Sequence, residues 1–444
     1  MESVERLLAQ ASDLVWGPAL LILLFGTHLY LTFRLRFIQR YTGLGIKLSF
    51  SREREGEGDI SHFGALTTAL AATIGTGNIV GVATAIAAGG PGAVLWIWLT
   101  GVFGMATKYA EAVLSLRYRT VGADGTMAGG PMYVLERGLG LRWLGIVFAV
   151  FTAAAAFGIG NMVQANSVAV LAHETLHVSP WITGVVLTVL TAVVILGGIR
   201  SIARVCEGLV PFMAIFNIVG CLVLLLMHAD RIAGTLGLIV SGGFTQQAAV
   251  GGFVGAGVRE AMRYGIARGL FSNEAGLGSA PIVAAAAQTT SPVRQALVSA
   301  TGVFWDTVVM CALTGLVIVN SGAWTQGLNG ASLSRAAFAD IPVIGPIVLT
   351  VGLVTFVFAT ILGWAYYGEK AAEYLFGAGA VRLYRVLWVI AVMIGSVVSL
   401  PAVWSFADIA NGLMAIPNLV CLLAMTGVVV AETRAHLWDS KNRL

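Results

Sequence analysis

The chain has 444 residues, of which 57% are hydrophobic and only 11% are charged. Soluble domains carry about 25% charged residues, so this composition excludes an ordinary soluble enzyme, whose surface would expose too much apolar area to water. The net charge of +4 is interpreted as a topology signal and not as a sign of nucleic-acid binding, because loop Lys and Arg orient membrane proteins.

Apolar stretches recur along the chain, each long enough, at roughly 20 residues, to cross a bilayer. They predict an all-α integral membrane protein with eleven transmembrane helices. The first stretch follows an acidic start, so we expect a retained helix and not a cleaved signal. The segment 231–250 is expected to lie at the membrane interface. The eleven stretches lie near 13–33, 62–88, 92–116, 143–172, 181–198, 207–228, 252–288, 294–320, 343–370, 381–400 and 404–431.

The basic residues predict the orientation. If the segment 34–61 is cytoplasmic, nineteen of the 26 Lys and Arg residues fall on the inner side of the membrane. Only Arg6, Arg231 and Arg335 fall on the outer side. This bias predicts a multi-pass protein of the plasma or inner membrane, with its N-terminus outside and its C-terminus in the cytoplasm.

Two of the eleven stretches, 62–88 and 252–288, are interrupted by Gly-rich polar segments. Without the first helix they are the first and sixth of ten, so each opens a group of five. Five is an odd number, so the second group enters the membrane from the opposite side. Paired interruptions of this kind indicate an inverted repeat with a transport site between the broken helices. The expected organisation is an extra N-terminal helix (1–34), two five-helix repeats (62–228 and 252–431) and a cytoplasmic tail (432–444).

The first interruption contains Thr73, Gly75, Thr76, Gly77 and Asn78. Glycine permits unusual backbone angles and close approach of a ligand to the main chain. Unwinding frees N–H groups at the start of the outer half-helix, which suit a carboxylate. The carbonyl groups that end the inner half-helix suit a cation.

The second interruption spans residues 269–278 and contains Ser272, Asn273 and Glu274. Ser272 or Asn273 is expected to cap a second half-helix, with Glu274 in its first turn. That is a structural role for Glu274. The alternative role is to bind a substrate amine or to tune a cation site.

Two further polar clusters lie inside apolar stretches. Asn161 and Gln164 share one helix face, with Phe157 one turn earlier. This face is suited to holding a polar ligand under an aromatic ring, or simply to hydrogen bonding between helices. Thr360 and Trp364 also share a face. A threonine hydroxyl is a suitable ligand for a small cation, and the tryptophan could bound a small pocket.

Three charged residues lie at membrane depth. Lys108 and Glu111 are three residues apart, so we expect a local ion pair. Asp306 has no basic neighbour in the sequence, which indicates either a coupling role or a distant structural partner. The candidate partners are Arg259, Arg263 and Arg268.

No residue pattern indicates a transition-metal site, a cofactor or a catalytic centre. The four cysteines show no CxxC spacing, and none of the six histidines is beside an interruption. We therefore expect no enzyme activity. A membrane enzyme would need a positioned nucleophile and base or a metal, and a channel would need a continuous polar lining.

Several segments together resemble the alanine/glycine:cation symporter family, and they occur in the expected order across most of the chain. They are Thr-Ile-Gly-Thr-Gly-Asn-Ile (73–79), Gly-Gly-Pro-Met-Tyr (129–133), Phe-Gly-Ile-Gly-Asn-Met-Val-Gln-Ala-Asn (157–166), Gly-Ile-Ala-Arg-Gly-Leu-Phe-Ser-Asn-Glu-Ala-Gly-Leu-Gly-Ser-Ala-Pro (265–281) and Gly-Trp-Ala-Tyr-Tyr-Gly-Glu-Lys (363–370).

The resemblance implies a LeuT-type fold and Na⁺-driven uptake of alanine or glycine by alternating access, for which a monomer in membrane lipid suffices. It implies Na⁺ as the only bound metal, carried with the substrate, and a cation site formed by Ala72, Thr73, Gly75 and Thr360. Combined with the polar clusters above, the expected substrate-binding residues are Thr73, Gly75, Thr76, Gly77, Asn78, Phe157, Asn161, Gln164, Phe271, Ser272, Asn273, Gly276 and Trp364.

Two positions depart from the pattern of similar proteins. Relatives often carry Ser or Thr where this chain has Ala359, and Ser where it has Ala365. A missing hydroxyl at 359 would remove a potential cation ligand. The alternative function is therefore a proton-coupled transporter of another small solute on the same fold.

Overall fold

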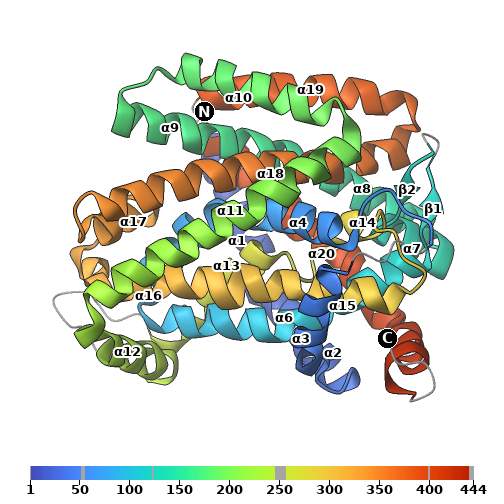
Figure 1. The fold of residues 1–444 in the computed structure, drawn as a ribbon, viewed down its shortest axis with the longest axis horizontal. Helices are drawn as coiled ribbons and strands as arrows, with labels where there is room; N and C mark the ends of the chain where they lie inside the picture. The colour runs from blue at the N-terminus through green and yellow to red at the C-terminus, as the bar shows by residue number, and fades with distance from the viewer. Residues whose placement is uncertain (1, 52–55, 123–124, 246–256, 399–400, 440–444) are drawn as a thin grey trace.

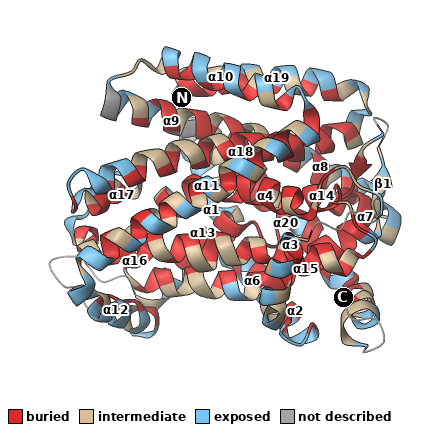
Figure 2. Ribbon diagram, viewed as in Figure 1, coloured by how far each residue is buried: buried red, intermediate tan, exposed pale blue. Residues whose placement is uncertain are grey.

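The computed structural model describes residues 2–51, 56–122, 125–245, 257–398 and 401–439, and nearly all of them are helical (Figure 1). Large apolar side chains are exposed along the outer helices, including Val185, Val189 and Val193 of α10 (Pro180–Ile195). Figure 2 shows exposed residues along α10 and α19 (Gly379–Val397), and buried residues along α4 (His62–Thr73) and α14 (Pro281–Ala284). Such an apolar exterior is stable in lipid.

The N-terminal region forms two helices where the sequence analysis expected one. The first helix is α1 (Glu2–Val15), and Pro18 opens α2 (Pro18–Arg34). The Trp16 indole between them donates a 3.0 Å hydrogen bond to the Asp408 carbonyl, which ties this junction to α20 (Pro401–Ala424). A 3-10 turn (Ile38–Tyr41) and α3 (Thr42–Ser49) follow.

The first interruption is a true break. Helix α4 (His62–Thr73) is capped by Ser61, whose hydroxyl accepts a hydrogen bond from the Gly64 amide. Ile74 is extended, and the chain then continues through the π-helical segment η2 (Gly77–Gly81) into α5 (Val82–Gly89). The two halves are bent by 53°. The predicted interruption of the stretch 62–88 is therefore confirmed.

The segments up to residue 244 include two long helices and one small hairpin, whose strands pair Thr120 with Ala128 and Val121 with Met127. Their bounds are α6 (Gly92–Arg117), β1 (Thr120–Val121), β2 (Met127–Ala128), α7 (Pro131–Leu139), α8 (Arg142–Phe157), η3 (Gly158–Met162), α9 (Val163–Leu176), α11 (Gly198–Met227), η4 (Ala229–Arg231) and α12 (Ile232–Phe244).

The second interruption differs from the prediction. Ser272 and Asn273 end α13 (Val258–Asn273) and do not cap a new half-helix, and only the four-residue α14 follows. The reason is a run of positive φ angles: 55° at Glu274, 88° at Gly276 and 86° at Gly278. Helical φ is negative, so these residues keep the chain irregular. The expected part of this stretch before residue 257 lies outside the described residues.

The remaining helices complete the bundle. They are α15 (Pro292–Val303), η5 (Phe304–Cys311), α16 (Ala312–Ser321), η6 (Ala323–Gln326), α17 (Gly330–Ala339), α18 (Ile344–Phe376), α21 (Thr426–Thr433) and η7 (Arg434–Trp438). Figure 1 shows α10 and α19 along one edge of the bundle and α12 near the opposite edge.

Seven helices in the described part of the chain are long and apolar enough to cross a membrane, and the bent pair α4–α5 is an eighth. The sequence analysis expected eleven. Among the expected spans, α10 is a shorter apolar helix, α6 carries Lys108 and Glu111, and α13 is charged and ends at the second break.

Small residues bring the central helices into contact at the first break. A Cβ atom on Gly363 of α18 would lie 2.6 Å from the Ala72 amide nitrogen, so only glycine allows this approach. Helix α6 packs against α13, which precedes the second break, and against α15, which follows it. The breaks are thus held between α18 and α6.

Gly278→Ala is expected to destabilise the protein. The residue has φ +86°, and an added Cβ would lie 2.7 Å from Pro131 and 2.8 Å from Phe148. Backbone strain and overpacking are expected to lower the free energy of unfolding by about 2–4 kcal/mol. The variant should therefore have a lower melting midpoint in detergent. Gly208→Ala is the control, since nothing lies within 4 Å of its added Cβ. Equal midpoints for the two variants would contradict this account.

Candidate functional site

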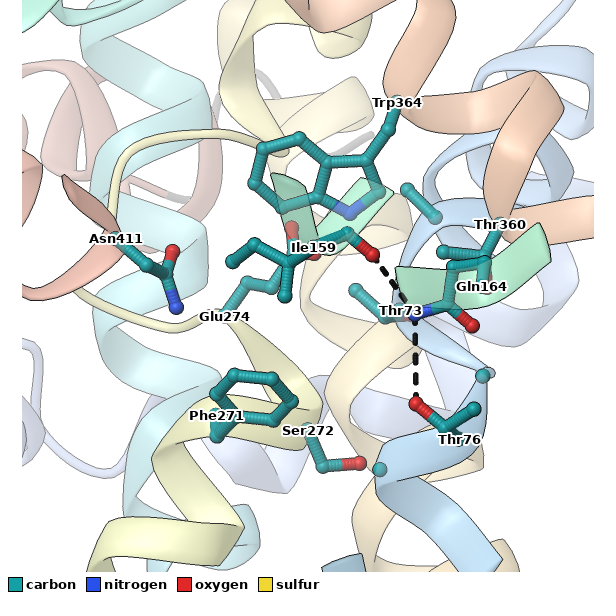
Figure 3. Close-up of a pocket in the computed structure, with 13 residues that line it drawn as sticks. Thr73, Thr76, Ile159, Gln164, Phe271, Ser272, Glu274, Thr360, Trp364 and Asn411 are labelled. Carbon is teal, nitrogen blue, oxygen red and sulfur yellow. Dashed lines mark hydrogen bonds between the residues drawn. The ribbon is translucent and has the colours of Figure 1, made fainter. Parts of the chain in front are cut away.

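A small cavity lies between the two breaks (Figure 3). The volume open to the centre of a water-sized sphere is about 20 Å³, which is room for about one water molecule. Its walls come from both breaks and from η3, α9, α18 and α20. The lining residues are Ala72, Thr73, Gly75, Thr76, Gly77, Ile159, Gln164, Phe271, Ser272, Glu274, Thr360, Trp364 and Asn411.

Main-chain groups of the first break are held by side chains. The Asn78 side-chain oxygen accepts a 2.9 Å hydrogen bond from the Gly75 amide. The Thr360 hydroxyl lies 3.3 Å from the Ile74 carbonyl oxygen and 3.0 Å from that of Phe356. A Cβ on Gly75 would lie 2.6 Å from this hydroxyl. Gly75 is therefore required for α18 to approach the break so closely.

At the second break, Glu274 directs its carboxylate toward the cavity region. This carboxylate accepts a 2.5 Å hydrogen bond from the Ser279 hydroxyl, and both Glu274 and Trp364 line the cavity. Asn273 uses its side-chain oxygen to accept from the Ala275 amide at 2.9 Å, which shapes the turn. Glu274 therefore lies at the cavity, whereas Asn273 organises the backbone beside it.

Two amide side chains present unsatisfied oxygen atoms at this cavity. Gln164 donates from its nitrogen to the Ile159 carbonyl at 2.8 Å and to Thr76 at 3.4 Å (Figure 3). The Gln164 Oε1 and Asn411 Oδ1 atoms are buried, and neither has a hydrogen-bond partner within the described residues. A buried acceptor without a donor is unfavourable, so a group with several N–H donors, such as an ammonium, has the chemistry to satisfy both oxygens.

Asp306 on η5 links the two breaks through neutral groups. Its carboxylate accepts hydrogen bonds from Asn78 at 2.8 Å, Ser272 at 3.1 Å and Thr307 at 2.7 Å. No ion pair within 4.0 Å joins it to Arg259, Arg263 or Arg268 in the described structure. Its partners are therefore different from those expected for a structural ion pair.

The expected local pair of Lys108 and Glu111 is also absent from the ion pairs of the described residues. The Glu111 Oε1 atom instead accepts hydrogen bonds from the amides of Gly276 and Gly278 at 3.0 and 3.1 Å, and from Asn418 at 2.7 Å. Gly276 and Gly278, both at positive φ, present their N–H groups to this carboxylate on α6, which accepts from both. Glu111 is therefore a positioning residue for the second break.

The cavity brings together ten of the predicted residues. Phe157 packs against the rings of Tyr384 and Trp388. Asn161 donates to the Trp388 carbonyl at 2.9 Å. These two residues, with Asn78, Asn273 and Gly276, stand outside the lining. The ten that line it are Ala72, Thr73, Gly75, Thr76, Gly77, Gln164, Phe271, Ser272, Thr360 and Trp364.

Sequence reasoning missed Ile159 and Asn411. Ile159 belongs to the segment 157–166, where only polar and aromatic residues were singled out. Asn411 is a polar residue within an apolar span, the same signal that drew attention to Asn161 and Gln164. Nothing in its spacing, however, relates α20 to the breaks.

The predicted cation ligands Ala72, Thr73, Gly75 and Thr360 share the cavity wall. The hydroxyl of Thr360 and the carbonyl groups that end α4 are hard oxygen donors, which Na⁺-sized cations prefer. Within the described residues, no group of three or more His, Cys, Asp or Glu side chains is arranged to hold a metal ion. These residues fit an alkali cation better than a transition metal.

Comparison with known proteins decides the family. The model of the sodium:alanine symporter family matches residues 1–443. This chain belongs to that family. It is 54% identical over 442 residues to the sodium/alanine symporter AgcS of Methanococcus maripaludis, with 97% of each chain covered. It is 35% identical to the probable sodium/glutamine symporter GlnT of Bacillus subtilis, covering 99% of this chain and 92% of that protein.

Solved structures share the fold of this symporter. MhsT in complex with L-phenylalanine matches with a TM-score of 0.59 at 15% identity, over 86% of this chain and 94% of the other. A manganese transporter of Eremococcus coleocola matches with a TM-score of 0.53. The symporter therefore has a LeuT-type fold, and its family membership makes it a membrane transporter that couples a cation to an amino acid.

Glu111→Ala is expected to lower stability and abolish uptake. It leaves two buried backbone amides without an acceptor, and each should lower the free energy of unfolding by about 1–3 kcal/mol. Glu111→Gln keeps an acceptor oxygen and should retain most of the stability. Melting midpoints and amino acid uptake measured on both variants test the positioning role. If Glu111→Ala behaves like wild type in both assays, Glu111 does not hold the break.

Proposed function

We propose that this protein takes up alanine, and also glycine, together with Na⁺ by alternating access. The observation that carries the proposal is the small cavity between two broken helices, which combines main-chain groups with two unsatisfied amide oxygens. Membership of the sodium:alanine symporter family supports the same conclusion.

The substrate is proposed to lie across the two breaks, in a conformation wider than the present one, whose cavity has room for about one water molecule. Its carboxylate meets the N–H end of the half-helix that starts at Thr76 and Gly77, where the helix dipole is positive. Its ammonium group meets the free oxygens of Gln164 and Asn411 and the carboxylate of Glu274. Five residues that were expected to bind substrate do not line the cavity. Asn78 and Asn273 are proposed to hold the backbone of the breaks. Phe157, Asn161 and Gly276 are proposed to support the lining residues from outside the cavity.

Na⁺ is proposed to bind at the end of α4, between main-chain oxygens of residues 72–75 and the Thr360 hydroxyl. Ala359 offers no hydroxyl at the neighbouring position. Selectivity for small side chains follows from the walls: Trp364, Phe271 and Ile159 close the cavity, and a longer side chain would have to displace one of them.

We also propose the membrane arrangement expected from the sequence. It consists of eleven spans, with an extra N-terminal helix and two inverted five-helix repeats (62–228 and 252–431). The N-terminus is outside, and the tail (432–444) is in the cytoplasm. A single chain in lipid contains the whole cavity, so a monomer suffices. During transport, one bundle of helices is proposed to rotate against the rest of the protein, with the site between them.

Purified protein in liposomes is expected to accumulate labelled alanine when an inward Na⁺ gradient is imposed, and labelled glycine more weakly or equally. A K⁺ gradient should drive neither. A pH gradient tests the alternative function, because a proton-coupled transporter would follow it in the absence of Na⁺. Uptake that ignores every cation gradient would reject symport.

Gly77→Leu is expected to abolish uptake by filling the cavity. The atoms nearest an added Cβ at Gly77 belong to Ser272 and Phe271, at 3.5 and 3.6 Å. Gly77→Ala therefore fits without displacement and is the matched control, with activity retained. The same liposome assay compares them, and unchanged uptake in Gly77→Leu would place the substrate elsewhere.

Thr360→Val is expected to raise the Na⁺ concentration for half-maximal uptake by about tenfold, or about 1.4 kcal/mol, because it removes a hard oxygen ligand. Thr355→Val is the control, since the Thr355 hydroxyl bonds to the carbonyls of Val351 and Gly352 on its own helix. Equal Na⁺ dependence in the two variants would exclude Thr360 from the cation site.

A further inference from the structure

A second cavity adjoins the first on the other side of Phe271. Phe271 lines both cavities, and the second is about five times larger, at about 100 Å³ by the same measure. Its walls come from α1, α13 and α20. Helix α1 packs along α20, so the N-terminal helix supplies one wall of this cavity.

The wall of this cavity carries equal numbers of positive and negative side chains, and in the described structure they do not form ion pairs with one another. Arg263 and Arg268 of α13 face the same space as Asp13 of α1 and Asp408 of α20. Arg268 acts electrostatically on Asp408. Among the ion pairs of the described residues, however, none within 4.0 Å joins either arginine to either aspartate. Two cationic and two anionic groups therefore line one cavity without neutralising each other directly.

A different cavity provides the contrast. It meets the small cavity at Thr76, has a volume of about 200 Å³ and is lined mainly by apolar side chains. Its charged residues, Glu174 and Arg335, form an ion pair with each other. A zwitterion would gain little there, because both charges of that cavity are already paired.

Phe271 connects the charged cavity to the small one. The Arg268 guanidinium lies 5.8 Å from the centre of the Phe271 ring, within cation–π range. A carboxylate that draws Arg268 toward itself would weaken this contact. Occupancy of the charged cavity thus acts on the wall that separates it from the small cavity.

We propose that the cavity formed by Asp13, Trp16, Arg263, Arg268, Phe271 and Asp408 is a second, outer binding site for a zwitterionic α-amino acid with a small side chain. The arginines take its carboxylate, and the aspartates take its ammonium group. In the proposed orientation this site faces the outside and loads the small cavity past Phe271. The inference rests on the proposed function, since it takes the transported amino acid as its ligand.

The test is protection of a cysteine placed in this cavity. Ser12 lines it, and the four native cysteines are buried, so Ser12→Cys offers a selective target for a methanethiosulfonate reagent. In purified Ser12→Cys protein with Na⁺, alanine at about four times its dissociation constant should slow modification about fivefold. Lactate and ethylamine, which each carry only one of the two charges, should leave the rate unchanged.

Three variants in the Ser12→Cys background separate the two cavities. Added Gly77→Leu fills the small cavity, and protection by alanine should persist. Added Arg268→Gln with Asp408→Asn should abolish protection. Added Arg231→Gln changes an exposed arginine that does not line this cavity; it is the matched control and should keep protection. As a measure independent of Gly77→Leu, equilibrium dialysis of labelled alanine with wild-type protein should reach two molecules per chain.

Protection that disappears with Gly77→Leu, together with one alanine per chain, would overturn the outer site and assign the signal to the small cavity. Protection by lactate or ethylamine alone would overturn the zwitterion assignment. If Na⁺-driven uptake is intact and alanine gives no protection, the outer site fails while the proposed function stands. If uptake itself is absent, the proposed function fails as well.

Discussion

Hydrogen bonding of the backbone at membrane depth is the constraint on which the rest of this structure depends. A helix that unwinds in lipid exposes N–H and C=O groups that must find partners. Here the partners are single side chains, one within the first break itself and two on neighbouring helices. Asn78 accepts from Gly75, Thr360 donates toward Ile74, and Glu111 accepts from the amides after Glu274. What these side chains leave unsatisfied is what a ligand can bind.

These partners also join the two breaks. Asp306 receives hydrogen bonds from Asn78 at the first break and from Ser272 at the second, so neither break can move far without changing the other. Gly363 lets α18 approach the backbone of Ala72, and Gly75 lets the Thr360 side chain approach the first break. Because small shifts in a close-packed site are not absorbed locally, a change at one break is expected to reach both. This is the mechanical requirement for coupling a cation to a substrate.

The sequence predicted the membrane class, the family and the first break well, because a run of Gly, Thr and Asn inside an apolar stretch is costly in lipid unless it lines a cavity. It failed where the outcome depended on neighbours distant in the chain. Ser272 looked like a helix cap, yet positive φ at Glu274, Gly276 and Gly278 prevents the second half-helix. The spacing of Lys108 and Glu111 suggested an ion pair, but the amides of Gly276 and Gly278 compete for the carboxylate. Asn411 could not be predicted, because no local sequence pattern indicates that α20 reaches the cavity.

The small volume between the two breaks limits what can pass between them. An enclosure that admits about one water molecule cannot hold a hydrated ion and a free solute side by side. In this shape, the space between the breaks is therefore too small for a hydrated ion to pass beside a solute. A carrier that takes this shape between transport cycles would protect the ion gradients on which a cell depends, because hydrated ions could not leak between the two breaks.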